Sequence, residues 1–504
     1  MKTGFRLAMT WLHDWSGLVI GWLAFAIALA GTLSVFRQEI GNWARPEASC
    51  CVTDSAAAGA AAVRWLSTHA AGSPAWYIRP ADARSTTTSA FWTDPKAPDG
   101  YVLKWLDATT GSPDGLRQTL GGEFFYRLHF ELQLPYPWGR VLSGSVAIAM
   151  LLALLTGIVA HRRIFVDFFT FRPGKGQRSW LDAHNLLAVT ALPFHLMIAF
   201  TGALTLSTLL MPWGALSAFG NDEAALARAL NPAAIDRAAT GKPAPLAPIR
   251  PILDEAQRRF QGGLVDIAII HPGDAAAVIT VTRAEDARVG TQAATLSFDG
   301  VSGRLLAAHD EHRPGLATYN LLYALHMAHF AQPMVRWIYF LSGLMLTAMI
   351  GTGLLLWTAK RARRVRERGF ALVERLNLGF VGGTPIAFAA FFIANRLLPT
   401  DLSGRPAAEV HAVFWTWAFL IVFAIFREPA KAWRDLATTA AVACAAIPLL
   451  DELSGSWRAD AVHVGVDLVA FAFAGAYAAA AMLAARGATK AGLQSTGRRW
   501  GTAA

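Results

Sequence analysis

Cysteine is scarce in this chain of 504 residues, which contains only Cys50, Cys51 and Cys444. Three thiols with no Cys-x-x-Cys spacing do not build a disulfide framework, and they give little support to a metal or redox role for the adjacent pair. Charged residues are also few, at 16% of the chain, whereas 54% of the residues are hydrophobic. Soluble domains carry about 25% charged residues, so this balance excludes an ordinary soluble protein.

Two nucleotide-binding motifs are missing as well. The sequence has no Gly-x-Gly-x-x-Gly stretch and no Gly-x-x-x-x-Gly-Lys-Ser/Thr stretch, so a self-contained flavin, NADPH or nucleotide domain is not expected. The net charge of +10 could suggest nucleic acid as a partner. Its positive residues gather instead in short loops between apolar runs, which is the positive-inside pattern of membrane proteins. We therefore expect no nucleic-acid partner.

The apolar runs are long enough to cross a bilayer, which takes about 20 residues per helix. We expect a mainly α-helical polytopic membrane protein with about eight transmembrane helices. The first run is a retained helix rather than a cleaved signal peptide, because it is too long and because Trp11, His13 and Asp14 stand at its entry. The predicted spans are 15–36, 139–160, 182–208, 336–357, 380–398, 409–426, 436–450 and 461–485.

Long polar segments at 38–122 and 213–316 separate four of these spans. Each segment contains strand-like runs and an Asp-x-x-Thr/Ser-Gly turn, at Asp107–Gly111 and at Asp299–Gly303. These patterns predict two small extracytoplasmic α+β domains. The loops at 162–178 and 360–368 and the C-terminal tail are rich in arginine and lysine, which predicts that they and both termini are cytoplasmic.

The first four spans repeat a pattern. His13 precedes Gly31 by 18 positions, and His184 precedes Gly202 by the same 18 positions. We interpret this as an internal parallel duplication with one repeat at 1–163 and the other at 178–362. Such repeats are related by a pseudo-twofold axis along the membrane normal. Residues 378–504, with four more spans and the basic tail, have no counterpart in either repeat.

The duplication brings histidines into pairs. The axis would place His13 opposite His184 near the cytoplasmic side, and His129 opposite His326 near the outer side. Ionisable residues inside a membrane are costly and are functional candidates, and histidine is a common axial ligand of haem iron. Two facing pairs at different depths predict two bis-histidine haem b sites. Small residues such as Gly17 and Gly21 would let a macrocycle approach the backbone.

The ligands of the outer iron stay open between neighbouring histidines. His195 lies 11 residues after His184, roughly 16 Å along a straight helix, and either replaces a member of the outer pair or packs beside Pro193. His329 is one turn from His326 and is a rival ligand. His161 is expected at the lipid headgroups. Four more histidines lie in the polar segments and are expected in solvent: His69, His271, His309 and His312. His411 and His463 lie in the part of the chain that is not duplicated, so no repeat supports a role for them.

The duplicated unit resembles the PepSY-associated transmembrane helix family, whose members include iron-regulated inner-membrane proteins and siderophore reductases. The resemblance covers about residues 5–362. Its motifs are Leu12-His13-Asp-Trp-Ser-Gly17-Leu, the two Asp-to-Gly turns, Leu128-His129, His184, Leu325-His326, and the pairs Thr156-Gly157 and Thr352-Gly353. This sequence departs from the pattern at Ala188, where a glycine is expected, and in its four extra spans, which leaves the electron donor undetermined.

The resemblance implies a bacterial inner-membrane protein with periplasmic PepSY domains, two haem b groups and electron transfer outward to a ferric siderophore or another Fe(III) chelate. It implies a haem-dependent ferric-chelate reductase supplied by quinol or by a cytosolic flavoprotein reductase. An alternative is a PepSY-containing envelope protein that binds peptides or regulates a partner without redox activity, and in which the histidines pack helices. A siderophore or metal transporter is a further alternative, because parallel repeats also occur there.

Overall fold

The computed structural model describes residues 3–48, 54–97, 100–161, 165–166, 170–284, 289, 294–361 and 369–500, the side chains of residues 487–500 excepted. Cys50 and Cys51 lie outside the described residues, as do most of the arginines expected to mark cytoplasmic loops (Arg162, Arg163, Arg363, Arg364, Arg366 and Arg368). The chain divides into two compact units. The helical unit comprises residues 1–46, 119–199 and 339–504, and the sheet unit comprises residues 47–118 and 200–338.

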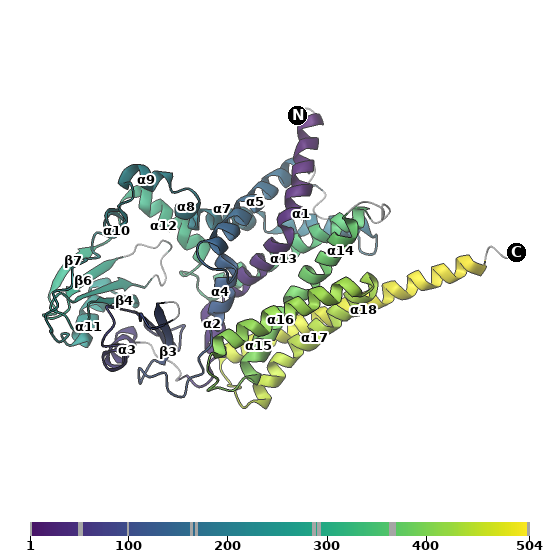
Figure 1. Ribbon diagram of the computed structural model, residues 1–504. Coiled ribbons are helices and arrows are strands. Elements are labelled where there is room, and N and C mark those ends of the chain that lie inside the picture. The colour runs from purple at the N-terminus through teal and green to yellow at the C-terminus, as the bar shows by residue number, and fades with distance from the viewer. Residues whose placement is uncertain are drawn as a thin grey trace. The chain divides into compact units, whose positions relative to one another are not determined.

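Long apolar helices dominate the chain (Figure 1). Seven of the described helices are long and apolar enough to cross a membrane, or eight if one bent helix pair is counted as a span. They are α1 (Thr3–Ser34), α5 (Trp138–Ala160), α13 (Pro333–Arg361), α14 (Phe370–Asn377) continued by the π-helix η1 (Leu378–Gly382) and α15 (Gly383–Leu397), α16 (Arg405–Phe426), α17 (Pro429–Leu453) and α18 (Ala461–Trp500). The expectation of a mainly helical, multi-pass membrane protein is confirmed.

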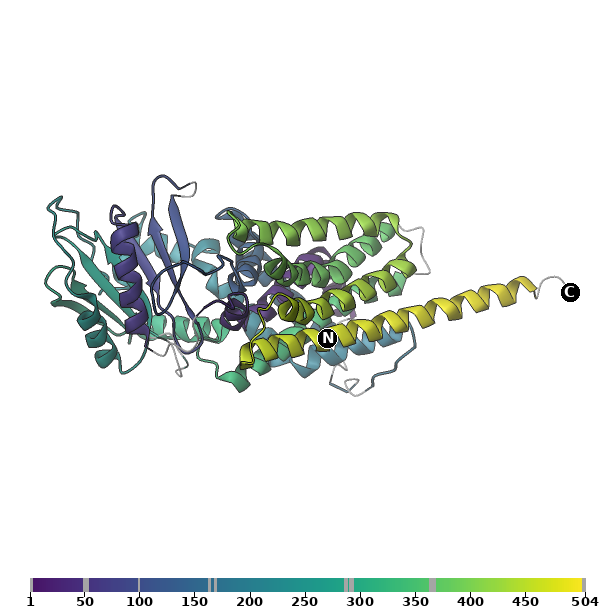
Figure 2. The ribbon, with the colours of Figure 1, turned by 90° about the horizontal axis from the view of Figure 1, so that it is seen from below.

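The positions of the spans agree with the sequence, but their ends differ. The run expected at 436–450 belongs to α17, which is 25 residues long and contains Pro448 near its end. The last four membrane helices lie side by side in Figure 2, where α16 contacts α15 and α18 contacts α17. Shorter helices complete this unit: α2 (Arg37–Trp43) and α4 (Gly122–Glu131).

The third span is broken, which corrects one expectation. It consists of α6 (Gln177–Thr190) and α7 (Leu192–Thr205), which bend by 72° around Ala191. Pro193 explains the break, because its ring clashes with the carbonyl of residue i−4 and it has no N–H to continue the first helix. His184 and His195 therefore do not lie on one face of a straight helix, as the spacing suggested.

The sheet unit contains a single antiparallel sheet of seven strands in the order β3-β2-β1-β4-β5-β6-β7. The strands are β1 (Ala75–Arg79), β2 (Thr87–Thr93), β3 (Tyr101–Asp107), β4 (Leu264–Ile270), β5 (Val278–Arg283), β6 (Thr295–Asp299) and β7 (Leu305–His309). The two polar segments thus share one sheet, where we had expected two separate domains. The reason lies at the join, where β1 and β4 pair along Ala75–Ile78 and Ile267–Ile270. This pairing removes two edge strands that would otherwise expose unpaired backbone groups.

Two helices cover one face of this sheet, α3 (Ser55–His69) and α11 (Ile249–Phe260) (Figure 1). Asp54 caps α3 by accepting hydrogen bonds from the backbone of Ala56 and Ala57. The alanine-rich α3 approaches the sheet closely, since a Cβ on Gly59 would lie 2.5 Å from Ile267. The remaining helices of this unit are α8 (Ser207–Leu210), α9 (Trp213–Phe219), α10 (Glu223–Leu230) and α12 (Pro314–Met327).

Candidate functional site

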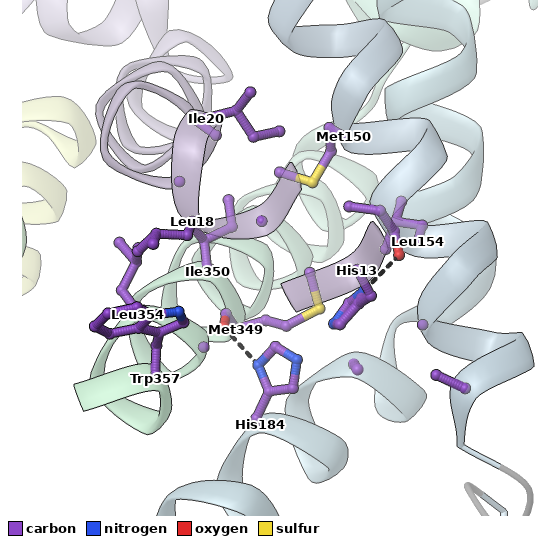
Figure 3. A pocket seen from close by; sticks show the side chains of 18 of the residues that line it. His13, Leu18, Ile20, Met150, Leu154, His184, Met349, Ile350, Leu354 and Trp357 are labelled. Atoms are coloured by element: carbon purple, nitrogen blue, oxygen red, sulfur yellow. Dashed lines mark hydrogen bonds between the residues drawn. The ribbon is translucent and has the colours of Figure 1, made fainter. Parts of the chain in front are cut away.

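The inner histidine pair is brought together as expected. The ring centroids of His13, on α1, and His184, on α6, lie 6.2 Å apart with an angle of 60° between the planes. Figure 3 shows both rings at one cavity, each joined by a hydrogen bond to a backbone carbonyl. Nδ1 of His13 donates to the oxygen of Ala153 at 2.8 Å, and Nδ1 of His184 donates to the oxygen of Met349 at 2.8 Å.

These hydrogen bonds assign the tautomer. A carbonyl oxygen only accepts, so each Nδ1 carries the hydrogen and each Nε2 of the neutral ring keeps its lone pair. Metal-bound histidines are commonly held in this way, because a partner on the other nitrogen fixes the orientation of the ring and raises its basicity. His13 and His184 therefore each have the nitrogen that a metal needs, and each ring is anchored from behind.

A glycine backs each ring. A Cβ added to Gly157 would lie 3.0 Å from Cε1 of His13, and a Cβ added to Gly353 would lie 3.0 Å from Cε1 of His184. The carbonyl that accepts the hydrogen bond belongs to the residue four positions earlier, one turn back along the same helix. The missing side chain thus opens the helix surface, so that the imidazole reaches this carbonyl. This contact gives the two Thr-Gly pairs of the sequence a structural role.

The cavity at this pair is mainly apolar and is lined by residues of five helices. Gly17 lines it and a Cβ there would meet nothing within 4 Å, whereas a Cβ on Gly21 would lie 2.7 Å from Leu354. Gly17 thus leaves open space, while Gly21 serves the contact between α1 and α13. Other lining residues come from α1, α5, α6, α7 and α13: Leu18, Ile20, Ala24, Met150, Leu154, Ala188, Leu192, Ile350 and Trp357 among them.

The pair fits the axial ligands of a haem iron. If both Nε2 atoms pointed at one metal ion, bonds of about 2 Å to each nitrogen and about 1.1 Å from each nitrogen to its ring centroid would separate the two centroids by about 6 Å. The observed separation of 6.2 Å agrees. Both rings lie in mainly apolar surroundings with Nδ1 bonded to a carbonyl oxygen, and Gly17 leaves open space in the cavity. Bis-histidine ligation is thus compatible with the residues present.

His129 repeats the same arrangement on α4. Its Nδ1 donates to the carbonyl oxygen of Ile27 at 2.9 Å, and a Cβ on Gly31 would lie 2.6 Å from that nitrogen. Ile27 is four residues before Gly31, as Ala153 is before Gly157. The glycine that the sequence repeat identified therefore backs a different histidine from the one that defined the spacing.

His326, on α12, also lies against a repeat glycine, since a Cβ on Gly202 would be 2.9 Å from its Cε1. Its Nδ1 pairs with the hydroxyl of Thr201 at 3.1 Å. His129 belongs to the helical unit and His326 to the sheet unit. Each shares with His13 and His184 a contact to a glycine and a polar partner on Nδ1. That likeness favours them over the other outer candidates.

The rival outer candidates lie in different settings. His195 is fully buried, in the first turn of α7, and its ring meets Phe194 edge to face at 6.3 Å. Within the described part of the chain its ring nitrogens make no hydrogen bond of good geometry, and the nearest polar partner for the ring is the backbone of Ser342. His329 follows the end of α12 at Met327 and is half-buried.

Of the other histidines, His69 is exposed as the sequence predicts, whereas His161 and His271 differ from the expectations. His161 ends α5 and lines the cavity of the inner pair rather than lying only among headgroups. His69 is exposed and stacks on Trp65 at 4.3 Å. His271 is half-buried and its Nε2 pairs with the backbone oxygen of Arg237 at 3.0 Å. It is therefore not a simple solvated side chain.

Sequence reasoning missed two buried ion pairs among the last four membrane helices. Arg396 pairs with Asp451 at 2.7 Å, and both side chains are 0% exposed. Glu409 pairs with Arg405, and their side chains are 0% and 1% exposed. The signal was present in the sequence, because ionisable residues inside apolar runs are functional or structural candidates by default.

Comparison with known proteins identifies the family of the chain. The family described as the PepSY-associated TM region matches residues 10–360, which is well over half of the chain. The protein belongs to this family. An uncharacterized protein of Pseudomonas aeruginosa is 28% identical over 353 residues, which cover 64% of this chain and 85% of that protein. The family match includes His13, His129, His184 and His326 and ends before α14, so the helices α14–α18 lie beyond it.

Proposed function

We propose that this PepSY-associated membrane protein is a di-haem b oxidoreductase that passes electrons across the bacterial inner membrane to a ferric siderophore or another Fe(III) chelate. One observation carries the proposal. His13 and His184 face a common cavity with their rings 6.2 Å apart, and each ring is held by an Nδ1 hydrogen bond that leaves Nε2 free to bind a metal.

His13 and His184 would hold the inner haem, and His129 in the helical unit and His326 in the sheet unit are each proposed as a ligand of the outer haem. A haem iron supplies one-electron transfer, which is the chemistry that reduction of Fe(III) to Fe(II) requires. The protein residues orient the imidazoles through the carbonyl groups of Ala153 and Met349. The apolar lining from Leu18, Met150 and Ile350 limits access of water, and this exclusion influences the potential of a bound metal.

The proposal includes the duplication of residues 1–163 and 178–362. The duplication is supported by hydrogen bonds that recur at equivalent positions of the two repeats. Asp107 accepts from the backbone of Thr109 and Thr110, as Asp299 accepts from Val301 and Ser302. The antiparallel pairing of β1 with β4 at the centre of the sheet is what a twofold relation between the two polar segments would produce.

The proposed orientation follows the positive-inside rule, with both termini in the cytoplasm and the sheet unit in the periplasm. Electrons would then enter near His13 and His184 from quinol or from a cytosolic flavoprotein reductase. They would leave near His129 and His326, where one electron converts each Fe(III) to Fe(II). The chelate holds Fe(II) more weakly, so the metal is released.

An optical spectrum of the purified protein tests this proposal. We expect a Soret band, with α and β bands that sharpen when dithionite is added. His13→Ala and His184→Ala should each remove about half of the haem, because one of two sites loses a ligand. His411→Ala is the matched control, since this histidine is exposed on α16 and lies beyond the family match.

Two results would contradict the proposal. The first is a colourless protein that gains no haem band when haem is added. The second is an unchanged haem content in both His13→Ala and His184→Ala. A colourless protein would favour the alternative of a peptide-binding or regulatory envelope protein.

A further inference from the structure

A second group of buried polar side chains lies in the helices that extend beyond the family match. It occupies the end of the helical unit where α17 turns into α18. Its members are Asp451 on α17, His463 and Asp467 on α18, and Arg396 on α15, which are 0%, 2%, 8% and 7% exposed as whole residues. Burying several ionisable groups is costly, so their charges and hydrogen bonds must be balanced locally.

Arg396 is a fixed cation in this group. Its Nε donates to Oδ1 of Asp451 at 2.7 Å, and its Nη2 donates to the backbone oxygen of Trp43 at 2.7 Å. Its guanidinium also lies 3.5 Å from the centre of the Trp43 ring. One guanidinium so placed neutralises one carboxylate, and Asp451 is that carboxylate.

Asp467 is a second buried acid without a cation of its own. It lies one helical turn after His463, on the same side of α18. It is close enough to Asp451, His463 and Arg396 to interact with all of them electrostatically, and Trp457 is its side-chain hydrogen-bond partner. If Asp451 and Asp467 were both ionised, the single charge of Arg396 would leave one negative charge uncompensated in a low-dielectric interior.

The hydrogen bonds of the group also lack one or more donors. Oδ2 of Asp451, Oδ1 of Asp467 and Nε2 of His463 have no hydrogen-bond partner within the described residues. Nδ1 of His463 already donates to Asp460 at 3.0 Å, so Nε2 of the neutral ring is an acceptor. Three buried acceptors thus lack a donor. Trp43 Nε1 is an unpaired donor, yet it could serve only one of the three.

We propose that Asp451, Asp467 and His463 form a buried proton-binding site, in which one exchangeable proton resides on the carboxyl group of Asp467. This proton removes the excess negative charge and supplies the missing hydrogen-bond donor. A proton is small enough to bind here without a cavity. The site lies outside the haem residues, and it stands whether or not the protein binds haem.

Asp460 connects the site to solvent. Its side chain is 40% exposed, and it accepts from Nδ1 of the nearly buried His463. A proton leaving Asp467 would be taken up by Nε2 of His463, and the imidazolium would then release its Nδ1 proton to the carboxylate of Asp460. Only a proton moves in this exchange, and the reverse steps reload the site from water.

Other charged groups surround the site. On α16, Glu409 is bonded to Arg405 and Asn395, Asn395 also contacts Arg396, and the buried Arg45 acts on Glu409 electrostatically. In the loop before α18, Arg458 donates to the backbone oxygen of Pro46 and keeps its positive charge. Among the cations of this set, the one that acts on Asp467 is Arg396, which is already bonded to Asp451.

Infrared difference spectroscopy of the full-length protein in lipid tests the proposal. A protonated carboxyl group gives a C=O stretching band that an ionised carboxylate lacks. We expect such a band at neutral pH, a shift of it in heavy water, and its decline in alkaline buffer. Asp467→Asn should remove one carboxyl band per chain, whereas Glu452→Gln should leave it, because Glu452 is an exposed acid next to Asp451.

A second variant guards against misfolding. Asp467→Glu keeps the acid and should move the band to another frequency rather than abolish it. The proposal is wrong if the wild-type protein shows no protonated-carboxyl band at neutral pH, since a buried water or an imidazolium would then serve the three acceptors. It is also wrong if the band persists unchanged in Asp467→Asn.

Discussion

Replacing Gly157 with alanine tests the role of the glycines that back the histidines. The new Cβ would lie 3.0 Å from Cε1 of His13, whereas carbon atoms in contact prefer about 3.5–4.0 Å. The ring must therefore retreat by about 0.5–1 Å. Its Nδ1 hydrogen bond to Ala153, now 2.8 Å long, would lengthen beyond the normal range.

The expected cost follows from that displacement. Losing one hydrogen bond of this kind costs about 1 kcal/mol, and losing the partner that orients a metal-bound histidine typically lowers affinity by about 10- to 100-fold. We expect Gly157→Ala to weaken haem binding at the inner site by about 10-fold or more. Gly353→Ala should act equally through His184, because the corresponding distance is also 3.0 Å.

The assay is a haem titration of the purified protein followed at the Soret band. Gly475→Ala is the control, since a Cβ at Gly475 on α18 meets nothing within 4 Å. If Gly157→Ala and Gly353→Ala bind haem as tightly as the wild type and Gly475→Ala do, the glycine contacts do not position ligands. The assignment of the inner pair would then lose its structural basis.

Three further predictions concern other parts of the protein. Gly31→Ala should disturb the outer haem spectrum and leave the inner one, because its Cβ would lie 2.6 Å from Nδ1 of His129. Glu409→Ala should lower the free energy of unfolding by about 3–5 kcal/mol, and with it the melting temperature, since it removes the carboxylate that pairs with the buried guanidinium of Arg405. Arg237 holds the folded-state pKa of Asp299 at about 2. Because this pKa lies below the unfolded value, Asp299 stabilises the fold at neutral pH, and denaturant titrations should show that contribution fading as the pH falls from about 4 toward 2.

Each of these three predictions can be checked against a control or a contrary result. Equal changes in both haem spectra of Gly31→Ala would contradict a separate outer site. Lys431→Ala removes an exposed ion pair with Glu428 and should leave the melting temperature nearly unchanged. Asp299→Asn should lose stability at neutral pH and should be no less stable than the wild type at about pH 2, and an equal pH dependence in both proteins would refute the role of the carboxylate.

Much of this organisation could be predicted from the sequence, because periodic patterns encode it directly. The apolar runs located the membrane helices, and the matched spacing of His13 and His184 anticipated the inner pair. The sequence did not reveal that Ala153 accepts the hydrogen bond of a histidine ring or that Gly157, four positions later, lies against that ring. Their role depends on which helix faces them, and that is a property of tertiary packing.

Other features followed from long-range contacts that no local pattern specifies. The bend before Pro193 separated His195 from the axis of α6, although the proline itself was visible in the sequence. The joining of β1 to β4 depended on two edge strands meeting across the unit. The pairing of Arg396 with Asp451 depends on how α15 and α17 face each other. The sequence therefore showed that both residues are charged but not that they pair.

The continuous sheet also constrains how the protein is made. Strand β1 ends at Arg79 and its partner β4 begins at Leu264, so at synthesis rates of about 5–20 residues per second the ribosome needs roughly 10–40 s to deliver the missing neighbour. During that interval the open edge of β1 is available to other chains. Folding of this sheet should therefore depend on chaperones that shield the first half, and slowing translation between the two halves should increase aggregation.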